Sequence, residues 1–298
     1  MDNNLNNSQP IVSIIMTCFN NCETLKDAIS SVINQSYQNW ELIFVDDGST
    51  DQSLKVVNQI IDNRVKIFIL DKNYGRGVSY QMGLNKANGK YIMFLDSDDW
   101  WYSNKIIKQI QYLKNNHKVM FVGSGLITSK NHKPVGVRCN KKFSNITNKK
   151  ITDPFIAFAT ICIRDTIISK YSFDKNLKVA QDSDFLRTLC MNEQYSNLED
   201  ILYVYNESSS FNWIKMKNAL KNTKIGLKKY KQKFFLDYFL NIVKINLKIF
   251  IYFILFSLRI EKLLLRCRVN IPSLENIKLY YKEKDLMLKV RSKIFKNI

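Results

Sequence analysis

Histidine is nearly absent from this sequence, and what is missing narrows the possible functions. The 298 residues include two histidines, His117 and His132, which excludes a His-rich metal site. The six cysteines form no CxxC motif, so reduced thiols in a cytosolic protein are the simplest account. The first ten residues are polar and do not read as a signal peptide, and we expect residues 1–10 to be disordered.

A long uncharged run is also missing. Residues 234–265 are strongly apolar, but charged side chains interrupt them, and the longest uncharged run, 249–258, has ten residues. A membrane-spanning helix needs about twenty. We therefore expect a helical tail that lies on an anionic membrane surface at the inner face of the cell membrane. A lysine-rich helical hairpin packed on the body is the alternative.

Positive charge is concentrated at one end of the chain. Of the net charge of +19, residues 212–298 carry +16 and residues 1–211 carry +3. The sequence thus divides into a near-neutral body, 11–211, and a basic tail, 212–298. Nucleic-acid binding is disfavoured because the basic residues surround an apolar segment rather than a groove with interleaved aromatics.

Short apolar runs and amphipathic stretches alternate four times in the first hundred residues. This alternation predicts an α/β fold with a mostly parallel sheet and helices on both faces. The expected strands cover 11–16, 41–45, 65–70 and 91–95. The regularity is lost after Trp101, where we expect a helix to about residue 115, strands at 119–124, 126–128, 135–138 and 201–205, a buried run at 155–163 and a helix over 181–191.

The segment YIMFLDSDDWW, residues 91–101, joins a buried strand to a crowd of carboxylates. Asp96, Asp98 and Asp99 repel one another and resist desolvation, and a divalent cation would relieve that cost. Oxygen ligands suit Mg²⁺ or Mn²⁺, which would bridge to phosphate oxygens. The alternative is an exposed acidic turn that caps the following helix through Asp99 or Ser103.

Other polar groups follow neighbouring strands and are expected at the same sheet edge. Thr17, Asp46 and Asp47 should lie beside the acidic turn, where the two carboxylates would accept hydrogen bonds from a base or a ribose. Turn formation explains Asp51 equally well. Asp182, in the segment QDSD, would act as general base on an incoming hydroxyl. Its alternative role is a helix N-cap.

Four segments together resemble the family 2 glycosyltransferases of GT-A fold: VSIIMTCFN, ELIFVDDGSTD, GKYIMFLDSDDWW and VAQDSDFLRTL. The resemblance covers about residues 11–210. It implies an inverting hexosyl- or N-acetylhexosaminyltransferase that uses a nucleotide-sugar, usually UDP-linked, with Mn²⁺ or Mg²⁺. Residues 11–101 would form the nucleotide-sugar half, and residues 102–211 the acceptor half.

The resemblance also implies roles for individual residues. Thr17 and Asp46 would contact the nucleotide, Asp96 would face the ribose and sugar, Asp98 would bind the metal with Asp96, and Asp182 would be the base. Three further residues are placed on the nucleotide side: Phe19, Asp47 and Gly75. Four are placed on the acceptor side: Asp99, Trp100, Gln181 and Arg187. For Arg187, an ion pair with a helix carboxylate is an equal alternative.

The sequence departs from the family pattern at several places. Tyr80 and Gln81 stand where an Arg-Asn pair is common, Gln181 precedes the base where Glu is usual, and Asn206 lies in the region where a histidine often follows the last strand. No QxxRW motif follows, which argues against a processive polysaccharide synthase.

The sequence therefore predicts a non-processive transferase that adds one sugar to a glycan or lipid-linked glycan, as in lipopolysaccharide or capsule assembly. A nucleotidyltransferase is one alternative, but the loop TCFNNCET lacks the glycine-rich, basic phosphate loop that it would need. A degenerate transferase that serves as a membrane-bound scaffold is the other.

Overall fold

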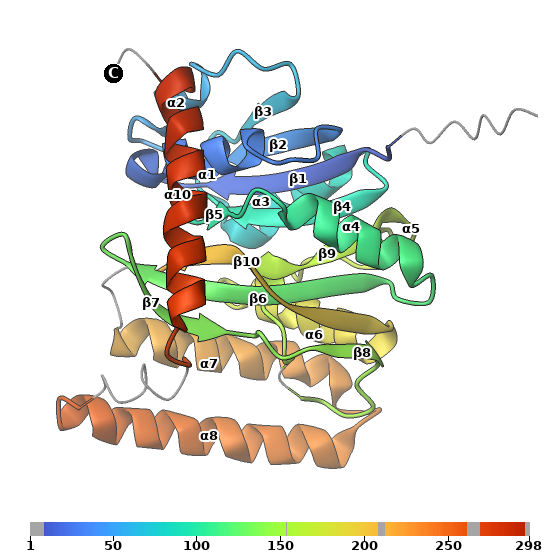
Figure 1. The fold of residues 1–298 in the computed structure, drawn as a ribbon. Helices are drawn as coiled ribbons and strands as arrows, with labels where there is room; N and C mark the ends of the chain where they lie inside the picture. Colours follow the sequence, from blue (N-terminus) through green and yellow to red (C-terminus); the bar gives the residue numbers. More distant parts are fainter. Residues whose placement is uncertain (1–8, 153, 208–211, 261–268, 296–298) are drawn as a thin grey trace, which may run out of the picture.

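A ten-stranded mixed sheet forms the centre of the protein (Figure 1). The computed structural model describes residues 9–152, 154–207, 212–260 and 269–295. The main path of the sheet runs β3-β2-β1-β4-β9-β6-β10-β5, with β7 paired to β6 and β8 to β10. The strands are β1 Val12–Cys18, β2 Trp40–Asp46, β3 Val65–Ile69, β4 Tyr91–Asp96, β5 Trp100–Trp101, β6 Phe121–Lys130, β7 Lys133–Arg138, β8 Phe143–Ile146, β9 Cys162–Arg164 and β10 Tyr195–Asn206.

The first four strands are parallel, as the alternating pattern predicts. β1 pairs with β2 on one side and β4 on the other, and β3 pairs with β2. Successive side chains of β4 enter opposite faces of the sheet, as the pleat of a strand requires. Met93 and Leu95 belong to one core cluster, and Ile92 and Phe94 belong to the other. The strand is therefore apolar at every position because both faces are covered.

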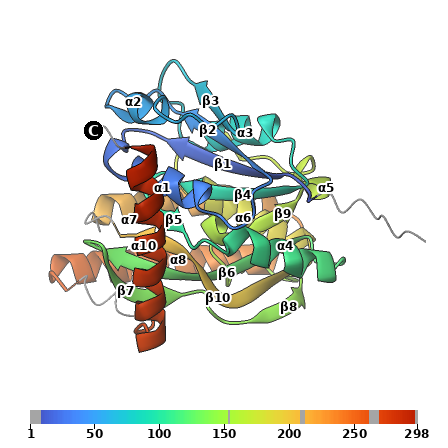
Figure 2. The same ribbon diagram turned by 45° about the horizontal axis from the view of Figure 1, so that its top comes forward.

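Helices cover both faces of the sheet (Figure 2). α1 and α4 contribute to the core on one face, and α3 and α6 contribute to the core on the other. The helices of the body are α1 Cys22–Ile33, α2 Ser53–Val57, α3 Arg76–Lys86, α4 Lys105–Asn115, the single-turn η1 Phe158–Thr160, α5 Asp165–Ile168 and α6 Gln181–Asn192. Those of the C-terminal region are α7 Trp213–Leu227, η2 Lys228–Tyr230, α8 Phe235–Ser257 and α10 Leu274–Ile294.

Several predicted elements in the body differ from the structure. The two strands expected at 119–128 are one strand, β6, because its residues stay paired to β10 across Gly125. The buried run expected at 155–163 is split into η1 and β9, and Phe155 at its start is 70% exposed. The second helix of the body is short: α2 ends at Val57, and Ile61 beyond it is fully exposed.

Of residues 1–10, which we expect to be disordered, the structure describes the last two. Residues 1–8 lie outside the described residues, but Pro10 is tied to the body. Its carbonyl oxygen accepts a hydrogen bond of 2.5 Å from Tyr37 Oη. Asn39 Nδ2 donates to the carbonyl oxygen of Gln9.

The basic C-terminal region behaves in two ways. α7 and α8 form a hairpin along one edge of the body, whereas α10 crosses back over the sheet (Figure 1). Tyr280 Oη lies 2.9 Å from Ser129 Oγ, and the backbone N–H of Ser103 donates to Glu283 Oε2 at 2.8 Å. Arg291 on α10 forms an ion pair of 2.5 Å with Asp27 on α1. α10 is therefore packed on the body, as the alternative to a membrane-bound tail predicts.

α8 instead exposes most of its apolar side chains. Its 23 residues are long and apolar enough to cross a membrane, by length and composition alone. The exposed side chains include Leu236, Phe239, Leu240, Val243, Leu247, Phe250 and Ile254. The opposite face packs on α7, with Ile245 buried against Leu227 and Tyr230. The absence of a long uncharged run therefore did not exclude a helix of spanning length.

Candidate active site

The register of the parallel strands brings distant polar residues to one sheet edge. Thr17 pairs with Asp96 between β1 and β4, and Cys18 pairs with Asp46 between β1 and β2. All three strands end here, so the loops that follow them share one space. This arrangement matches the expectation that the polar loops meet at the carboxyl ends of the strands.

Asp96 is held by two side chains from α3. Tyr80 Oη donates to Asp96 Oδ1 at 2.5 Å, and Arg76 Nη1 lies 3.8 Å from the same oxygen. Tyr80 is buried, and burial together with the nearby Asp96 raises the pKa of its hydroxyl. Tyr80 stands where an arginine is common in the family, and it holds the Asp96 carboxylate through a neutral hydrogen-bond donor. Arg76 supplies the positive charge, and sequence reasoning had missed it.

Asp98 and Asp99 have different surroundings although they are neighbours. Asp99 is 1% exposed and accepts hydrogen bonds from Tyr203 Oη at 2.6 Å and the backbone N–H of Asn206 at 2.8 Å. It therefore anchors the acidic turn to β10. This differs from the expectation that Asp99 faces the acceptor. Asp98 lines an open cavity, and burial, with a further contribution from Asp96, raises the pKa of its carboxyl group.

The three carboxylates fit a hard divalent cation in number and spacing. Asp96, Asp98 and Asp99 each offer an oxygen atom within 4.8 Å of the others. Both oxygens of Asp99 and one oxygen of Asp96 already accept hydrogen bonds. A cation would therefore find its ligands in Asp98 and the second oxygen of Asp96, where it would offset the repulsion that raises the pKa of Asp98.

The Asp46-Asp47 pair at the end of β2 has two separate tasks. Asp46 Oδ2 accepts from the backbone N–H of Ser49 at 2.8 Å, whereas its buried Oδ1 has no hydrogen-bond partner among the described residues. Asp47 accepts from the backbone N–H groups of Tyr74 and Gly75 at 2.8 and 2.9 Å. Gly75 has a φ of 93°, a conformation that side chains rarely adopt. Asp47 therefore shapes the loop before α3, and Asp46 has one buried oxygen without a partner among the described residues.

A cavity of about 450 Å³ opens at these strand tips, and we call it the strand-tip cavity. It gathers five of the predicted residues: Thr17, Phe19, Asp47, Gly75 and Asp98. The other residues that line it are Cys18, Asn21, Asn73, Arg76, Ser97, Tyr205 and Lys215. Five residues predicted in the first half of the chain thus line one cavity, whereas Asp46 and Asp96 are not among its lining residues.

Asp182 lies in the first turn of α6, which begins against α3. A Cβ atom at Gly77 would lie 3.0 Å from Gln181 Cγ, so the two helix starts are in close contact. Burial raises the pKa of Asp182, Asp96 raises it further, and Arg76 lowers it. Since Arg76 also interacts with Asp96 and Asp98, one guanidinium links the acidic turn to the candidate base.

The helix-capping alternatives are not what the structure has. The residue before α4 is Asn104, and neither Ser103 nor Asp99 caps that helix. α6 is preceded by Ala180, and the Asp182 carboxylate accepts only from the next backbone N–H, that of Ser183, at 2.7 Å. Gln181, expected on the acceptor side, donates from Nε2 to the carbonyl oxygen of Leu177 at 2.8 Å.

Trp100 does not reach the site. The residue is 3% exposed, and its ring packs 5.8 Å from that of Tyr102 and 5.5 Å from that of Tyr280 on α10. The two-residue strand β5 pairs with β10 and turns the Trp100 side chain into this cluster. The expectation that it faces the acceptor therefore fails.

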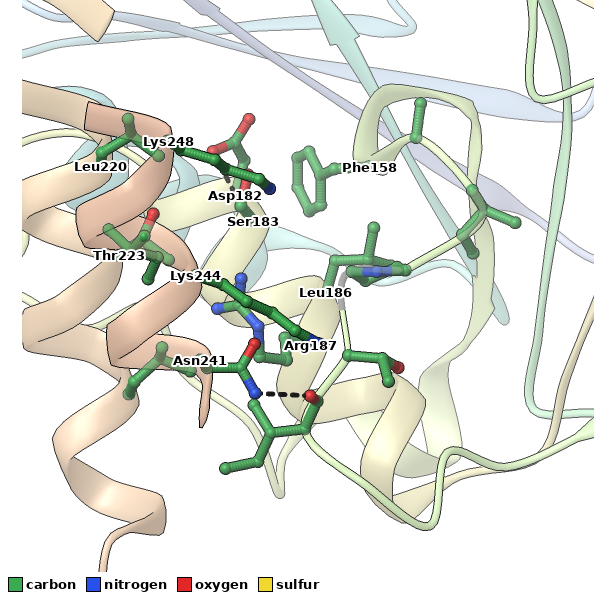
Figure 3. Close-up of a pocket in the computed structure, with 17 residues that line it drawn as sticks. Phe158, Asp182, Ser183, Leu186, Arg187, Leu220, Thr223, Asn241, Lys244 and Lys248 are labelled. Atoms are coloured by element: carbon green, nitrogen blue, oxygen red, sulfur yellow. Dashed lines mark hydrogen bonds between the residues drawn. The ribbon is translucent and has the colours of Figure 1, made fainter. Parts of the chain in front are cut away.

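A second cavity, of about 630 Å³, is lined by Asp182 together with residues of the C-terminal helices (Figure 3). We call it the α6–α8 cavity because its walls come from α6, α7, α8 and the segment 151–158. Its charged residues are Asp182, Arg187, Lys244 and Lys248. Arg187 is 3% exposed and lies 4.0 Å from Asp184, but Lys229 is closer to that carboxylate, at 2.6 Å.

Comparison with known proteins gives a family for this chain. The sequence profile of Glycosyl transferase family 2 matches residues 13–170, just over half of the chain. An uncharacterized glycosyltransferase of Haemophilus influenzae is 47% identical over 119 residues, which are 39% of this chain and 48% of that protein. The chain thus spans about half the length of this relative.

A second relative has a described activity. The UDP-Glc:alpha-D-GlcNAc-diphosphoundecaprenol beta-1,3-glucosyltransferase WfgD of Escherichia coli is 34% identical over 169 residues, which are 55% of this chain and 64% of that protein.

Two solved structures share the fold. S. aureus TarS, residues 1–349, in complex with UDP-GlcNAc, has a TM-score of 0.62 at 19% identity and covers 95% of this chain and 82% of its own. The mannosyltransferase PcManGT from Pyrobaculum calidifontis, with GDP-Man and Mn²⁺, has a TM-score of 0.59 at 13% identity, covering 97% and 88%.

Proposed function

Because the chain belongs to glycosyl transferase family 2, we propose that it transfers one hexosyl or N-acetylhexosaminyl residue from a UDP-sugar to a lipid-linked glycan. The name of the Escherichia coli relative supports both substrate classes, since it includes UDP-Glc and a GlcNAc-diphosphoundecaprenol. The UDP-GlcNAc in the TarS structure supports the donor class. The product would belong to the assembly of a surface polymer such as lipopolysaccharide or capsule.

The observation that carries the proposal is the charge environment of Arg76, whose Nη1 lies 3.8 Å from Asp96 Oδ1 and whose pKa is raised by nearby carboxylates. Arg76 interacts with Asp96 and Asp98 in the acidic turn and with Asp182 at the start of α6. In our assignment, Thr17, Asp46 and the loop at Gly75 hold the nucleotide in the strand-tip cavity. Residues 11–101 thus form the donor half, and residues 102–211 supply the base and the acceptor side.

Asp98 and Asp96 are our assignment for the residues that hold a divalent cation. When bound, Mn²⁺ or Mg²⁺ would offset the charge that develops on the leaving diphosphate. Asp99 would act only through position, because its hydrogen bonds to Tyr203 and Asn206 fix the turn that carries Asp98.

In the reaction we assign to this site, Asp182 is the general base. The acceptor hydroxyl oxygen forms a bond to the anomeric carbon while the bond from that carbon to the diphosphate oxygen breaks, and the hydroxyl proton passes to the Asp182 carboxylate. A single displacement inverts the anomeric configuration. Burial raises the pKa of Asp182, which makes the carboxylate a stronger base than an exposed aspartate.

We also propose that α8 rests on the inner face of the cell membrane. Its outer face exposes a row of large apolar side chains, including Leu240, Leu247 and Phe250. Lys244 and Lys248 lie on the side that lines the α6–α8 cavity. A helix that lies in the interface keeps these two charges beside the body, whereas a spanning helix would carry them into hydrocarbon.

The test is a transfer assay with the full chain, UDP-Glc or UDP-GlcNAc, and a GlcNAc-diphosphate lipid. We expect glycosylated lipid and UDP in equal amounts, with loss of turnover in EDTA and recovery with Mn²⁺. Asp98→Ala should lose the metal-dependent rate by about 10²-fold or more because charge on the leaving group is no longer offset. Asp71→Ala, an exposed carboxylate after β3, is the matched control. Full activity of Asp98→Ala, or turnover unaffected by EDTA, would contradict the metal assignment.

A further inference from the structure

The α6–α8 cavity has a net positive charge, whereas the charged residues that line the strand-tip cavity balance one another, with Asp47 and Asp98 against Arg76 and Lys215. The four charged side chains of the α6–α8 cavity are one carboxylate, Asp182, and three cations: Arg187, Lys244 and Lys248. Cations gathered around an enclosed space favour an anion with more than one charge. The acceptor sugar alone would bring no such charge.

The three cations come from two elements that face each other. Arg187 is 3% exposed and enters the cavity from α6. Lys244 and Lys248 are four residues apart on α8, so they lie on one face of that helix. Figure 3 shows both lysines reaching from α8 across the cavity, Lys248 toward Asp182 and Lys244 toward Arg187. Three cations can offset the charge of two linked phosphates.

The remaining wall of the cavity is largely apolar. It includes Ile156, Phe158 and Leu186 on the body side and Leu220 and Ile245 on the hairpin side. A ligand that combines anionic and apolar parts would therefore match the lining. On the outside of the same helix, the apolar face of α8 begins within one turn of Lys244, where Leu240 and Leu247 are exposed.

We propose that the α6–α8 cavity is the acceptor site for the diphosphate of a lipid-linked sugar, with Arg187, Lys244 and Lys248 as its phosphate ligands. This inference rests on the proposed function. The diphosphate lies between the two lysines and the arginine, the sugar extends toward Asp182, and the lipid leaves along the apolar outer face of α8. Membrane docking and acceptor binding then use neighbouring faces of one helix.

The first test measures binding without catalysis. Farnesyl diphosphate, which carries no sugar, is titrated into the full chain with the donor site saturated by UDP. In the double variant Lys244→Ala/Lys248→Ala, we expect Kd to rise by at least about tenfold, because two charge-assisted contacts are lost. The affinity for UDP should be unchanged.

The matched control is Lys278→Ala/Lys282→Ala on α10. These lysines are also exposed and four residues apart, but they lie outside the cavity. We expect this variant to bind farnesyl diphosphate as the wild type does. An unchanged Kd in the α8 variant, or an equal loss in both variants, would overturn the proposal in favour of diffuse charge attraction.

The second test compares two acceptors that carry the same sugar. With a GlcNAc-diphosphate lipid, the α8 variant should have a raised KM. With an octyl glycoside of GlcNAc, which lacks the diphosphate, kcat/KM should stay at the wild-type value. If the wild type transfers to neither acceptor, the proposed function fails, while the farnesyl diphosphate titration still decides whether the cavity binds diphosphate.

The third test separates the acceptor from membrane lipid. Binding to phosphatidylglycerol vesicles and to phosphatidylcholine vesicles is measured for the wild type and the α8 variant. We expect both proteins to bind phosphatidylglycerol vesicles equally. A variant that loses these vesicles but keeps its affinity for farnesyl diphosphate would show that the lysines contact lipid headgroups, and the proposal would be wrong.

Discussion

The strand-tip cavity and the α6–α8 cavity are built by different means. The strand-tip cavity is lined mainly by residues at strand ends and in the loops after them, and their positions follow from strand register and backbone hydrogen bonds. The α6–α8 cavity is lined by long cationic and apolar side chains from helices outside the sheet. The first geometry is set by the central fold, and the second depends on how the α7–α8 hairpin packs. We therefore expect donor chemistry to be more sensitive to single changes than acceptor binding.

The largest effect on kcat is expected from a substitution at Asp182. Asp182→Asn removes the proton acceptor but keeps the shape of the side chain, so kcat should fall by about 10²- to 10⁴-fold. UDP affinity should be unchanged. Single-turnover transfer and calorimetric titration of UDP measure the two quantities.

The control for Asp182→Asn is Asp165→Asn, an exposed carboxylate in the first turn of α5. It should leave kcat unchanged. Normal transfer by Asp182→Asn would exclude this residue as the base and leave the α6–α8 cavity without a link to the chemistry.

Arg76→Gln should have the next largest effect on kcat, because it removes a cation that acts on both the acidic turn and Asp182. Arg76 lowers the pKa of Asp182, so its loss should raise that pKa. Since the base must be deprotonated, the acid limb of the rate–pH profile should move to higher pH. We also expect kcat to fall by about tenfold to a hundredfold as charge compensation near the acidic turn is lost.

Arg64→Gln is the matched control for this change, because Arg64 is paired with Asp62 at the start of β3 and outside the strand-tip cavity. An acid limb that stays in place in Arg76→Gln would mean that the guanidinium does not act on Asp182. The acidic turn and Asp182 would then not be linked electrostatically through Arg76.

A smaller effect is expected on the outer face of α8. Leu247→Asp/Phe250→Asp places two charges where apolar side chains would enter the membrane interface. Each buried side chain of this size contributes about 1.5–3 kcal/mol, so sedimentation with vesicles should fall at least about tenfold. Transfer to a water-soluble alkyl glycoside should be unaffected.

The control for α8 is Ile61→Asp/Ile271→Asp, which also replaces two exposed isoleucines but lies off that helix. Vesicle binding should remain at the wild-type value. If the α8 variant still sediments with vesicles, the helix is not the membrane contact, and the two faces of α8 do not have separate roles.

The smallest effect concerns a buried lysine in the body. Lys105 is fully buried, with Nζ donating to Gln109 Oε1 at 2.7 Å and to the carbonyl oxygen of Thr160 at 2.8 Å. Burial lowers the pKa of Lys105 to about 7. Between that pH and the pKa of an unfolded lysine, the unfolded chain binds more protons than the folded one, so stability should rise with pH.

Urea unfolding at pH 7 and pH 9 tests this expectation. The free energy of unfolding should rise with pH more steeply in the wild type than in Lys105→Met, by at most about 1.4 kcal/mol per pH unit. Lys114→Met, exposed on the same helix, should keep the wild-type slope. Equal slopes in the wild type and Lys105→Met would mean that Lys105 stays charged in the folded protein.

The sequence was most informative where one local pattern decides the structure. Each acidic motif directly follows a strand, so parallel pairing was enough to predict that Asp46, Asp96 and Asp98 meet. Arg76 was missed because a single basic residue after a glycine loop has no periodic pattern. Its role depends on Tyr80, one turn later, which holds Asp96 in place.

Side-chain direction and long-range packing could not be predicted in the same way. Asp99 and Trp100 lie beside Asp98 in the chain, yet the short pairing of β5 with β10 turns both away from the cavity. The contribution of Lys244 and Lys248 depends on the packing of the α7–α8 hairpin, and both lysines are more than sixty residues from Asp182 in the sequence. In a search of the sequence alone, these lysines are ordinary members of a basic tail.

The return of α10 to the body has a consequence for how the chain is made. Its ion pair with Asp27 and the packing of α10 on α1 join segments that lie about 260 residues apart. During synthesis, this surface of α1 stays uncovered until the ribosome has produced α10. A truncation before α8 would therefore leave an apolar surface of the catalytic body exposed. We expect such a fragment to aggregate rather than to remain a water-soluble enzyme.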